Sequence, residues 1–444
     1  MNQAFLDYYR CPASLANFEL ESGWSNETRP GYFEFGPGLI CYGRLGIDGC
    51  EKDSGPFPDV FNQVRIEGST CILPFNPTDI ANNLRYERYM TQVRKPSWKS
   101  LTRKAYYALR PLFPISVRRR LQRIWLAGRD RNPFPHWPVD RTVDQMFEQL
   151  MLLRLRASPK SGIPFIWFWP ESKSSCAIMT HDVETAAGLK FVNELMDIND
   201  SFCIKSSFQI IPNGRYAVSR DILLSIQKRG FEVNVHDLKH DGHLFDNHEQ
   251  FQKFASQINE FGVLFGSKGF RSAILYRNQE WYGALRFSYD MSVPNVGHMD
   301  PQRGGCCTVM PYFVGEILEI PVTTTQDYTL FHIFGTYSND LWREQINQIM
   351  RQYGLISFII HPDYLDTSKS VNAYRKLLSH LSELRSNAEL WIALPEEVDS
   401  WWRQRNQMRL VLDEHNWRIE GPGSERARVA YATLENDRLA YTFS

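Results

Sequence analysis

The second half of the chain alternates short apolar runs with amphipathic segments, and this alternation constrains the fold more than any other feature. Apolar runs at 177–179, 206–211, 231–235 and 355–360 are each followed by a segment with helical spacing or by a polar turn. Repeated strand–helix units of this kind form parallel sheets, and their number here predicts a (β/α) barrel. Such a barrel carries its functional residues at the carboxyl ends of its strands.

Two of these predicted strands end in side chains that can carry chemistry. The first run leads to Asp182 and Glu184, whose spacing of two points both carboxylates to the same side if the strand continues. The third run leads to His236 and His240, whose spacing of four predicts that both imidazoles lie on one face of a helical turn. A carboxylate and two histidines leave positions open for water, as a catalytic divalent metal requires. A His pair alone is more often a polar helix face, so the metal site depends on both motifs together.

The order and spacing of these residues resembles the polysaccharide deacetylase family, the NodB-type enzymes of carbohydrate esterase family 4. The likeness is to members whose first motif is Asp-x-Glu and which are found with bacterial surface-polysaccharide loci. The resemblance covers residues 176–405. Within this range, further matched segments are Gly269-Phe-Arg271, 287–292, 318–321 as the strand of the fourth motif, Ile360-His361-Pro362 and 401–405. The resemblance implies a distorted (β/α) barrel of the polysaccharide deacetylase type, a TIM-like arrangement.

The resemblance also implies a role for each matched residue. Asp182 is the expected base that takes the proton of the attacking water, and Arg271 is expected to orient that carboxylate and lower its pKa. His361 is the expected general acid that protonates the leaving amine. A divalent metal, most commonly Zn²⁺, is expected on the implied ligands Glu184, His236 and His240.

The activity that follows is a metal-dependent hydrolase acting on C–N amide bonds. It is expected to remove N-acetyl or O-acetyl groups from a sugar or glycan, free or lipid-linked, in bacterial surface polysaccharide biosynthesis. Two alternatives stay open: a catalytically inactive glycan-binding or assembly protein that retains the barrel, and a small-molecule amidohydrolase. Bound metal separates the first alternative from the enzymes, and acetate release from sugars separates the second.

Three regions are expected along the 444 residues, because the chain is too long for one ordinary core. We expect residues 1–160 to form a small α/β domain, residues 161–405 to form the barrel, and residues 406–444 to form a small antiparallel β appendage. The boundary between the first two is placed in the turn-rich stretch 158–162.

The strongest local charge bias lies at 94–131, which holds twelve Lys and Arg residues and one acid. An apolar stripe at helical spacing runs through it, with arginines outside the stripe. The stripe is Val117, Leu121, Ile124 and Trp125, and the arginines are Arg118, Arg119, Arg120 and Arg123. One hypothesis is a face that rests on anionic lipid or anionic glycan. The alternative, favoured because surface helices commonly show this pattern, is a solvated helix that packs against the main domain, with its arginines paired elsewhere.

Composition and simple motifs narrow the classes of partner, location and cysteine chemistry that the chain can have. Basic and acidic residues balance at 50 each, so global charge indicates no partner, and no recognition motif for nucleic acid accompanies the basic segment. No signal peptide and no apolar run long enough to span a bilayer are visible. The eight cysteines form no Cys-x-x-Cys pair, which disfavours a zinc ribbon and a disulfide framework. We therefore expect a cytoplasmic protein. Peripheral contact at the inner face of the membrane through 94–131 is the hypothesis that follows if the basic segment binds lipid.

Overall fold

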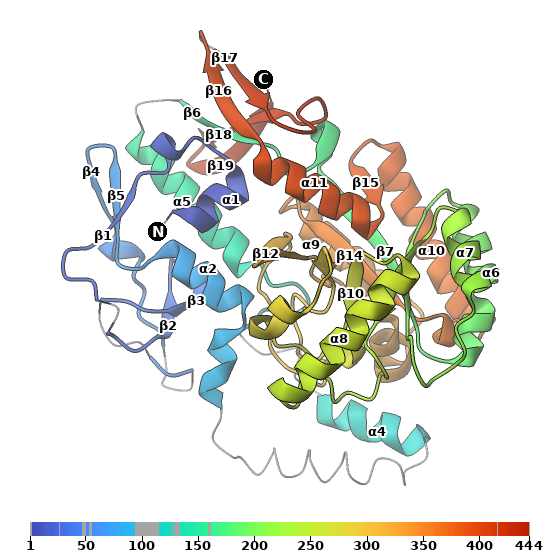
Figure 1. Cartoon of the computed structure of the whole chain (residues 1–444). Coiled ribbons are helices and arrows are strands. Elements are labelled where there is room, and N and C mark those ends of the chain that lie inside the picture. Colours follow the sequence, from blue (N-terminus) through green and yellow to red (C-terminus); the bar gives the residue numbers. More distant parts are fainter. Residues whose placement is uncertain are drawn as a thin grey trace.

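The computed structural model (Figure 1) describes all residues except 1, 26, 47–49, 53–55, 94–114, 127, 129–133, 159–160, 415 and 444. A large sheet occupies the centre. The N-terminal region, blue in Figure 1, lies beside this sheet, and the C-terminal strands, red, lie at the top of the view.

The main sheet is built around β7 (Ser175–Val183), all nine residues of which are buried. Its order is β12-β13-β11-β10-β9-β8-β7-β14, and β15 also pairs with β7. The pairs are parallel except β12 with β13. The other strands are β8 (Ser207–Ile210), β9 (Glu232–His236), β10 (Gly269–Arg271), β11 (Tyr289–Asp290), β12 (Tyr312–Val314), β13 (Ile317–Glu319), β14 (Leu355–Ile360) and β15 (Leu390–Ala393).

This sheet curls into part of a barrel, and a threonine-rich loop bridges the gap between β13 and β14. The backbone N–H of Thr324 donates to the carbonyl of Ser357 over 3.2 Å, and its hydroxyl donates to the same carbonyl over 2.8 Å. The Thr323 hydroxyl donates to the carbonyl of Leu355 over 2.7 Å. The predicted α/β class with a curled, mostly parallel sheet is therefore confirmed. Because the strands are parallel, the carboxyl ends of β7, β9, β10 and β14 meet at one rim.

Helices follow most strands and cover the outer face of the sheet. They pack on it through residues such as Met179 of β7 and Leu195 of α6, which share one buried apolar cluster. Side-chain caps fix where they begin, as Thr185 does for α6 and Asn247 for α8. These helices are α6 (Ala186–Asp200), α7 (Arg220–Lys228), α8 (His248–Phe265), α9 (Asp340–Met350), α10 (Ser368–Ser386) and α11 (Pro395–Gln407).

The N-terminal region shares a hydrophobic core with the barrel. Phe5, Phe147, Leu318 and Trp401 belong to one buried cluster, although they come from opposite ends of the chain. The region contains α1 (Gln3–Tyr9), β1 (Phe18–Leu20), β2 (Gly31–Glu34), β3 (Ile40–Gly43), β4 (Arg65–Glu67), β5 (Thr70–Leu73), α2 (Pro77–Arg85), α4 (Ile115–Leu126) and α5 (Thr142–Ala157). Most of the basic segment 94–131 lies outside the described residues, and α4 is the described part. The expected boundaries at 160 and 405 stay predictions.

Short antiparallel strands lie in the C-terminal stretch. They are β16 (Arg409–Asp413), β17 (Asn416–Glu420), β18 (Val429–Glu435) and β19 (Arg438–Phe443). β18 also pairs with β6 (Gly162–Ile166), the strand that enters the barrel, so β18 and β19 pack on the main body. The β16–β17 hairpin forms a sheet of its own and projects at the top of Figure 1. In the part of the chain that the structure describes, helices are too short or too polar to cross a membrane.

Candidate active site

The end of β7 presents two carboxylates to the rim of the barrel. Asp182 is buried on the strand, and Glu184 follows directly after it with a partly open side chain. Arg271, the last residue of β10, donates through Nη1 to Asp182 Oδ1 over 2.7 Å. The same Nη1 donates to the Thr180 hydroxyl, and Arg271 Nε donates to the carbonyl of Met291 over 2.9 Å. These bonds fix the orientation of the Asp182 carboxylate.

Two histidines face these carboxylates from the end of β9. His236 Nε2 lies 3.8 Å from Asp182 Oδ2, and His240 Nε2 lies 2.9 Å from Glu184 Oε1. The two imidazole centroids are 4.8 Å apart. The prediction that a helical turn brings the rings together is wrong. β9 ends at His236, and the chain then bends through a loop in which Asp237 and His240 have left-handed backbone, each with φ 56°.

Hydrogen bonds from Asp237 explain why this loop keeps its shape. Its carboxylate accepts from the backbone N–H of Leu238 over 2.5 Å and from that of Ala273 over 3.0 Å. Its own N–H donates to the carbonyl of Arg271 over 2.7 Å. Aspartate tolerates the left-handed region because its short side chain bonds locally, so the loop holds His240 opposite Glu184 without a helix.

The residues present fit a divalent metal. Glu184, His236 and His240 offer one ligand atom each, and these atoms lie within 4.8 Å of one another. The Nδ1 of His236 lies 3.1 Å from the carbonyl of Arg271, which fixes the tautomer that leaves Nε2 free to bind a metal. Among the described residues, Nε2 of His236 and Nδ1 of His240 have no hydrogen-bond partner although they are buried, and the close contact of His240 Nε2 is with Glu184. Buried polar atoms normally find partners, so convergent orphans indicate a ligand site.

His361 completes the rim from the end of β14. Its Nε2 points toward Glu184 Oε1 at 3.5 Å, while its Nδ1 lies 2.7 Å from Asp327 Oδ1. The second carboxylate oxygen of Asp327 accepts the backbone N–H of His361 over 2.7 Å. Sequence reasoning missed Asp327. The available signal was a lone acid in the polar run that follows the β13 strand.

The charges around the rim set the two pKa values that matter for proton transfer. Burial raises the pKa of Asp182, but the Arg271 guanidinium, with His236 and His361, outweighs burial and holds it below its usual value. Burial lowers the pKa of His361, but the Asp327 carboxylate, with Glu184, holds it well above its ordinary value. An ionised carboxylate and a protonated imidazole therefore face the same space near neutral pH.

The loop after β14 also fixes the turn that carries Glu184. Asp363 accepts hydrogen bonds from the backbone N–H groups of Glu184, at 3.3 Å, and of Gly188, at 3.1 Å, and from the Thr185 hydroxyl. A Cβ at position 188 would lie 2.5 Å from an Asp363 oxygen, so glycine is required for this close approach. Asp363 thus ties the Glu184 turn to the segment that carries His361.

Two neighbours of the motifs lie away from the rim. His181 packs toward the helices, where its Nε2 accepts from the Asn199 amide over 3.1 Å and burial lowers its pKa to about 3, so it fills space as a neutral ring. Glu319, in the stretch matched to the fourth motif, accepts from the backbone of Val293 over 3.0 Å and lies beside Asp290. That stretch contributes no side chain to the rim, and Asp327, further along the chain, does so instead.

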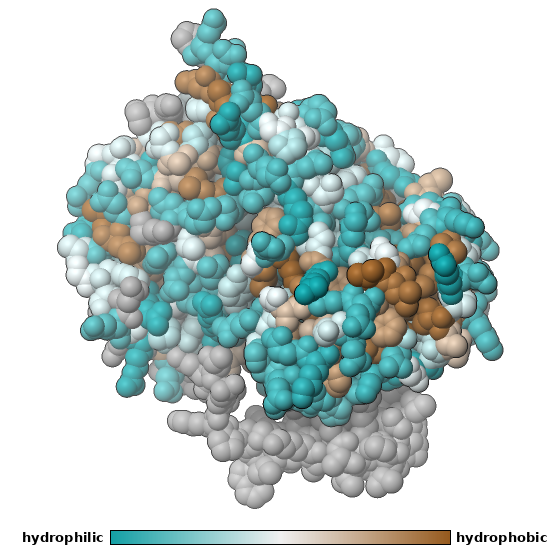
Figure 2. All heavy atoms as spheres, viewed as in Figure 1, coloured by the Kyte–Doolittle hydropathy of each residue, from teal (hydrophilic) through white to brown (hydrophobic). Residues whose placement is uncertain are grey.

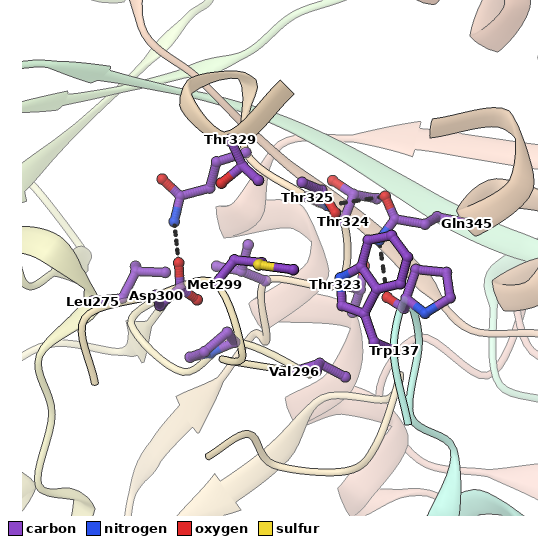
Figure 3. A pocket seen from close by; sticks show the side chains of 14 residues that line it. Trp137, Leu275, Val296, Met299, Asp300, Thr323, Thr324, Thr325, Thr329 and Gln345 are labelled. Atoms are coloured by element: carbon purple, nitrogen blue, oxygen red, sulfur yellow. Dashed lines mark hydrogen bonds between the residues drawn. The ribbon is translucent and has the colours of Figure 1, made fainter. Parts of the chain in front are cut away.

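A small cavity lies behind the loop that carries Asp327 (Figure 3). It encloses about 30 Å³, enough for a water molecule, and is lined by Trp137, Met299, Asp300 and residues 323–326 among others. Gln326 donates to Asp300 over 3.1 Å across it. The residues of the metal cluster do not line this cavity, so it is separate from the rim.

Comparison with known proteins found similar solved structures, while no protein-family model and no curated protein matched. A Mycobacterium smegmatis protein described as a polysaccharide deacetylase is 17% identical, with a TM-score of 0.44, over 58% of this chain and 99% of that one. A family 4 acetyl xylan esterase from Clostridium thermocellum, in complex with a cobalt ion, is 13% identical, with a TM-score of 0.33. The match covers 51% of this chain and 91% of the esterase. A pseudoenzyme of the CE4 family is 13% identical, with a TM-score of 0.31. The match covers 52% of this chain and 68% of the pseudoenzyme. Several polysaccharide deacetylases are thus among the structures that this chain is similar to.

Proposed function

We propose that this chain is a metal-dependent hydrolase that removes acetyl groups from a sugar. The proposed substrate is an N-acetylated, or alternatively O-acetylated, sugar used to build a bacterial surface polysaccharide. Its proposed place of action is the cytoplasm, which cell fractionation would test.

One observation supports this function above the others: five groups at the ends of three parallel strands, β7, β9 and β14, converge at one rim with complementary protonation states. Glu184, His236 and His240 form a set of ligands, and Asp182 and His361 lie on either side of it. A binding protein would need neither the Arg271–Asp182 bond nor the Asp327–His361 bond, because each of them adjusts a pKa rather than a shape.

The residues divide the work of amide hydrolysis between them. A divalent metal bound at this site supplies Lewis acidity, which polarises a carbonyl and lowers the pKa of water. Asp182, kept ionised by Arg271, accepts the proton of the attacking water. His361, kept protonated by Asp327, donates a proton to the leaving nitrogen so that the amine departs neutral.

Metal analysis and product analysis together test the proposal. The purified protein should hold one Zn²⁺, or another divalent ion, per chain, with anomalous scattering at Glu184, His236 and His240. It should release acetate from N-acetylated oligosaccharides or sugar nucleotides, and chelation should abolish the release. Protein that binds metal but releases no acetate from any acetylated sugar would point to the small-molecule amidohydrolase. Protein that binds glycan but no metal would point to the inactive binding protein.

A further inference from the structure

Helix α4 lies at the lower edge of the molecule in Figure 1. It is held by polar contacts on one side. Gln122 Oε1 accepts from the Tyr328 hydroxyl over 2.8 Å, and Arg123 Nη2 donates to the carbonyl of His332 over 3.4 Å. The side of the helix that faces the body is therefore its polar side.

Three described residues of the apolar stripe of α4 are exposed: Val117 is 39% exposed, Leu121 38% and Ile124 66%. The contacts of Gln122 and Arg123 agree with the prediction that the helix packs against the main domain, but these three apolar side chains stay exposed. Arg120 is exposed near this row, and Arg123, which contacts the body through the His332 carbonyl, also keeps an exposed side chain, so the row has cationic side chains near it. A surface helix normally buries its apolar stripe, and one that exposes it has an unfilled contact.

We propose that α4 docks the protein on an anionic lipid bilayer. An apolar row flanked by arginines suits a helix that lies in the plane of the interface, with the row among the acyl chains and the guanidinium groups among phosphates. The twelve residues of α4 include four arginines and no acid, and the whole segment 94–131 has a strongly basic sequence. An anionic glycan would bind the arginines but would leave the apolar row in water, which is why lipid is the better occupant.

The docking face lies next to the catalytic rim. Tyr328, which contacts α4, contacts the His332 ring with centroids 5.4 Å apart, and His332 contacts Tyr364 at 4.7 Å. Tyr364 in turn contacts His361 at 4.7 Å. A bilayer under α4 would therefore lie beside the rim, where a sugar carried on a lipid would meet the site; this last point depends on the proposed function, while docking itself does not.

A second exposed apolar patch provides a control. Figure 2 shows brown side chains over α7 and the end of α8, where Val263 is 84% exposed and Leu264 71%. Helix α8 carries two glutamates and one lysine, so its charge does not favour an anionic surface. Substitutions in this pair remove as much exposed apolar side chain as substitutions in α4 do, without touching the basic face.

Vesicle flotation of the full chain tests the proposal. The protein should float with phosphatidylcholine vesicles that contain phosphatidylglycerol, and high salt should release it. Arg120→Gln with Arg123→Gln should weaken this binding by more than about tenfold, since each arginine near such a surface contributes about fivefold in affinity. Leu121→Ser with Ile124→Ser should also weaken it by about tenfold or more. Val263→Ser with Leu264→Ser should leave it unchanged.

Several outcomes would overturn the proposal. The first is that the parent protein does not float with the vesicles, and the second is that the α4 and α8 variants lose vesicle binding equally. The third is that the apolar α4 variants still bind vesicles, which would mean that the arginines alone hold an anionic glycan. A dimer of the parent that dissociates in Ile124→Ser would show that a second copy covers the stripe.

Circular dichroism and metal content confirm that each variant is folded. If the double variant is not folded, the single Ile124→Ser change, at the most exposed position, replaces it in the flotation assay. Because Asp182→Asn should float like the parent, loss of catalysis and loss of docking are separate results.

Discussion

Two buried clusters of charged side chains differ in how completely their polar atoms are hydrogen-bonded. Between the N-terminal region and the barrel, Arg277 Nε donates to Glu87 Oε2 over 2.7 Å, its Nη2 donates to Glu87 Oε1, and its Nη1 donates to the carbonyl of Leu275 over 2.8 Å. Glu87 accepts a further bond, from the N–H of Gly305 over 2.6 Å. At the rim, by contrast, Nε2 of His236, Nδ1 of His240 and Nη2 of Arg271 have no hydrogen-bond partner among the described residues.

This difference separates a structural cluster from a site. The Arg277–Glu87 pair is internally satisfied, so its charges stabilise each other and offer nothing to a ligand. The rim keeps buried donors and acceptors unsatisfied, which costs folding free energy unless a ligand compensates. Mutations in the two clusters should therefore have different consequences, and four measurements sharpen or break the contrast.

The largest effect is expected at the ligands of the rim. Glu184→Ala should lose metal and lower the rate of acetate release by about a thousandfold or more, because several kcal/mol of Lewis-acid stabilisation disappear. Asp182→Asn keeps the side-chain volume and the three ligands, so metal should stay while the rate falls by about a hundredfold. Metal content and acetate release are measured on the same samples. If Asp182→Asn strips the metal and Glu184→Ala retains it, the roles of the two carboxylates are reversed.

The next effect is expected in the Arg277–Glu87 pair and concerns stability alone. Glu87→Gln leaves the Arg277 charge buried without its counter-charge, which should lower the free energy of unfolding by about 3 kcal/mol. Urea denaturation measures this change. The metal content per folded chain should stay at the parent value, and a loss of metal in this variant would mean that the two clusters are coupled.

Metal should stabilise the rim by a comparable amount. Zn²⁺ at about a hundred times its dissociation constant should raise the free energy of unfolding by about 2.7 kcal/mol, because it binds the folded state. Thermal unfolding with and without Zn²⁺ measures the effect. His240→Ala should remove it, whereas Glu87→Gln should keep it. A parent protein whose stability does not respond to divalent ions would contradict the fit of the site to a metal.

The smallest effect is expected in the pH dependence. Catalysis requires His361 protonated, and the Asp327 carboxylate raises its pKa, so activity should fall only as pH rises through that raised value. Asp327→Asn removes the anion and should move the alkaline limb of kcat/KM to lower pH by about one unit, or about 1.4 kcal/mol. The acidic limb, which reports Asp182, should not move. An unchanged alkaline limb would show that His361 is not the acid.

The sequence predicted the members of the site better than their surroundings. Asp182, Glu184, His236 and Arg271 follow or end strands, and the carboxyl ends of parallel strands must meet at one rim. His240 was placed correctly for the wrong reason, because the loop that replaces the helical turn depends on bonds between Asp237 and residues distant in sequence. Asp327 lies in a loop with no periodic pattern, and its partner is 34 residues away, so no local signal connects the two.

The same limit applies to the fold. The alternation of strands and helices is local information, and it indicated the parallel sheet. The core shared by the two ends of the chain is not local. Arg405, on α11, donates to the carbonyl of Tyr8, 397 residues earlier, and to that of Ile166. Contacts of this kind follow from the tertiary arrangement and leave no periodic pattern in the sequence.

The pairing of β7 with strands that come much later in the chain also determines the order in which this protein can fold on the ribosome. Thr180 of β7 donates to the carbonyl of Phe358 of β14, 178 residues later. At translation rates of roughly 5 to 20 residues per second, one edge of β7 waits roughly ten to thirty-five seconds for its permanent neighbour. During that time β8 and β9 can pair, but the edge that will take β14 exposes unpaired backbone in a very apolar strand. The nascent chain should therefore be most prone to aggregation just before β14 emerges, and its folding rate should be limited by this distant pairing.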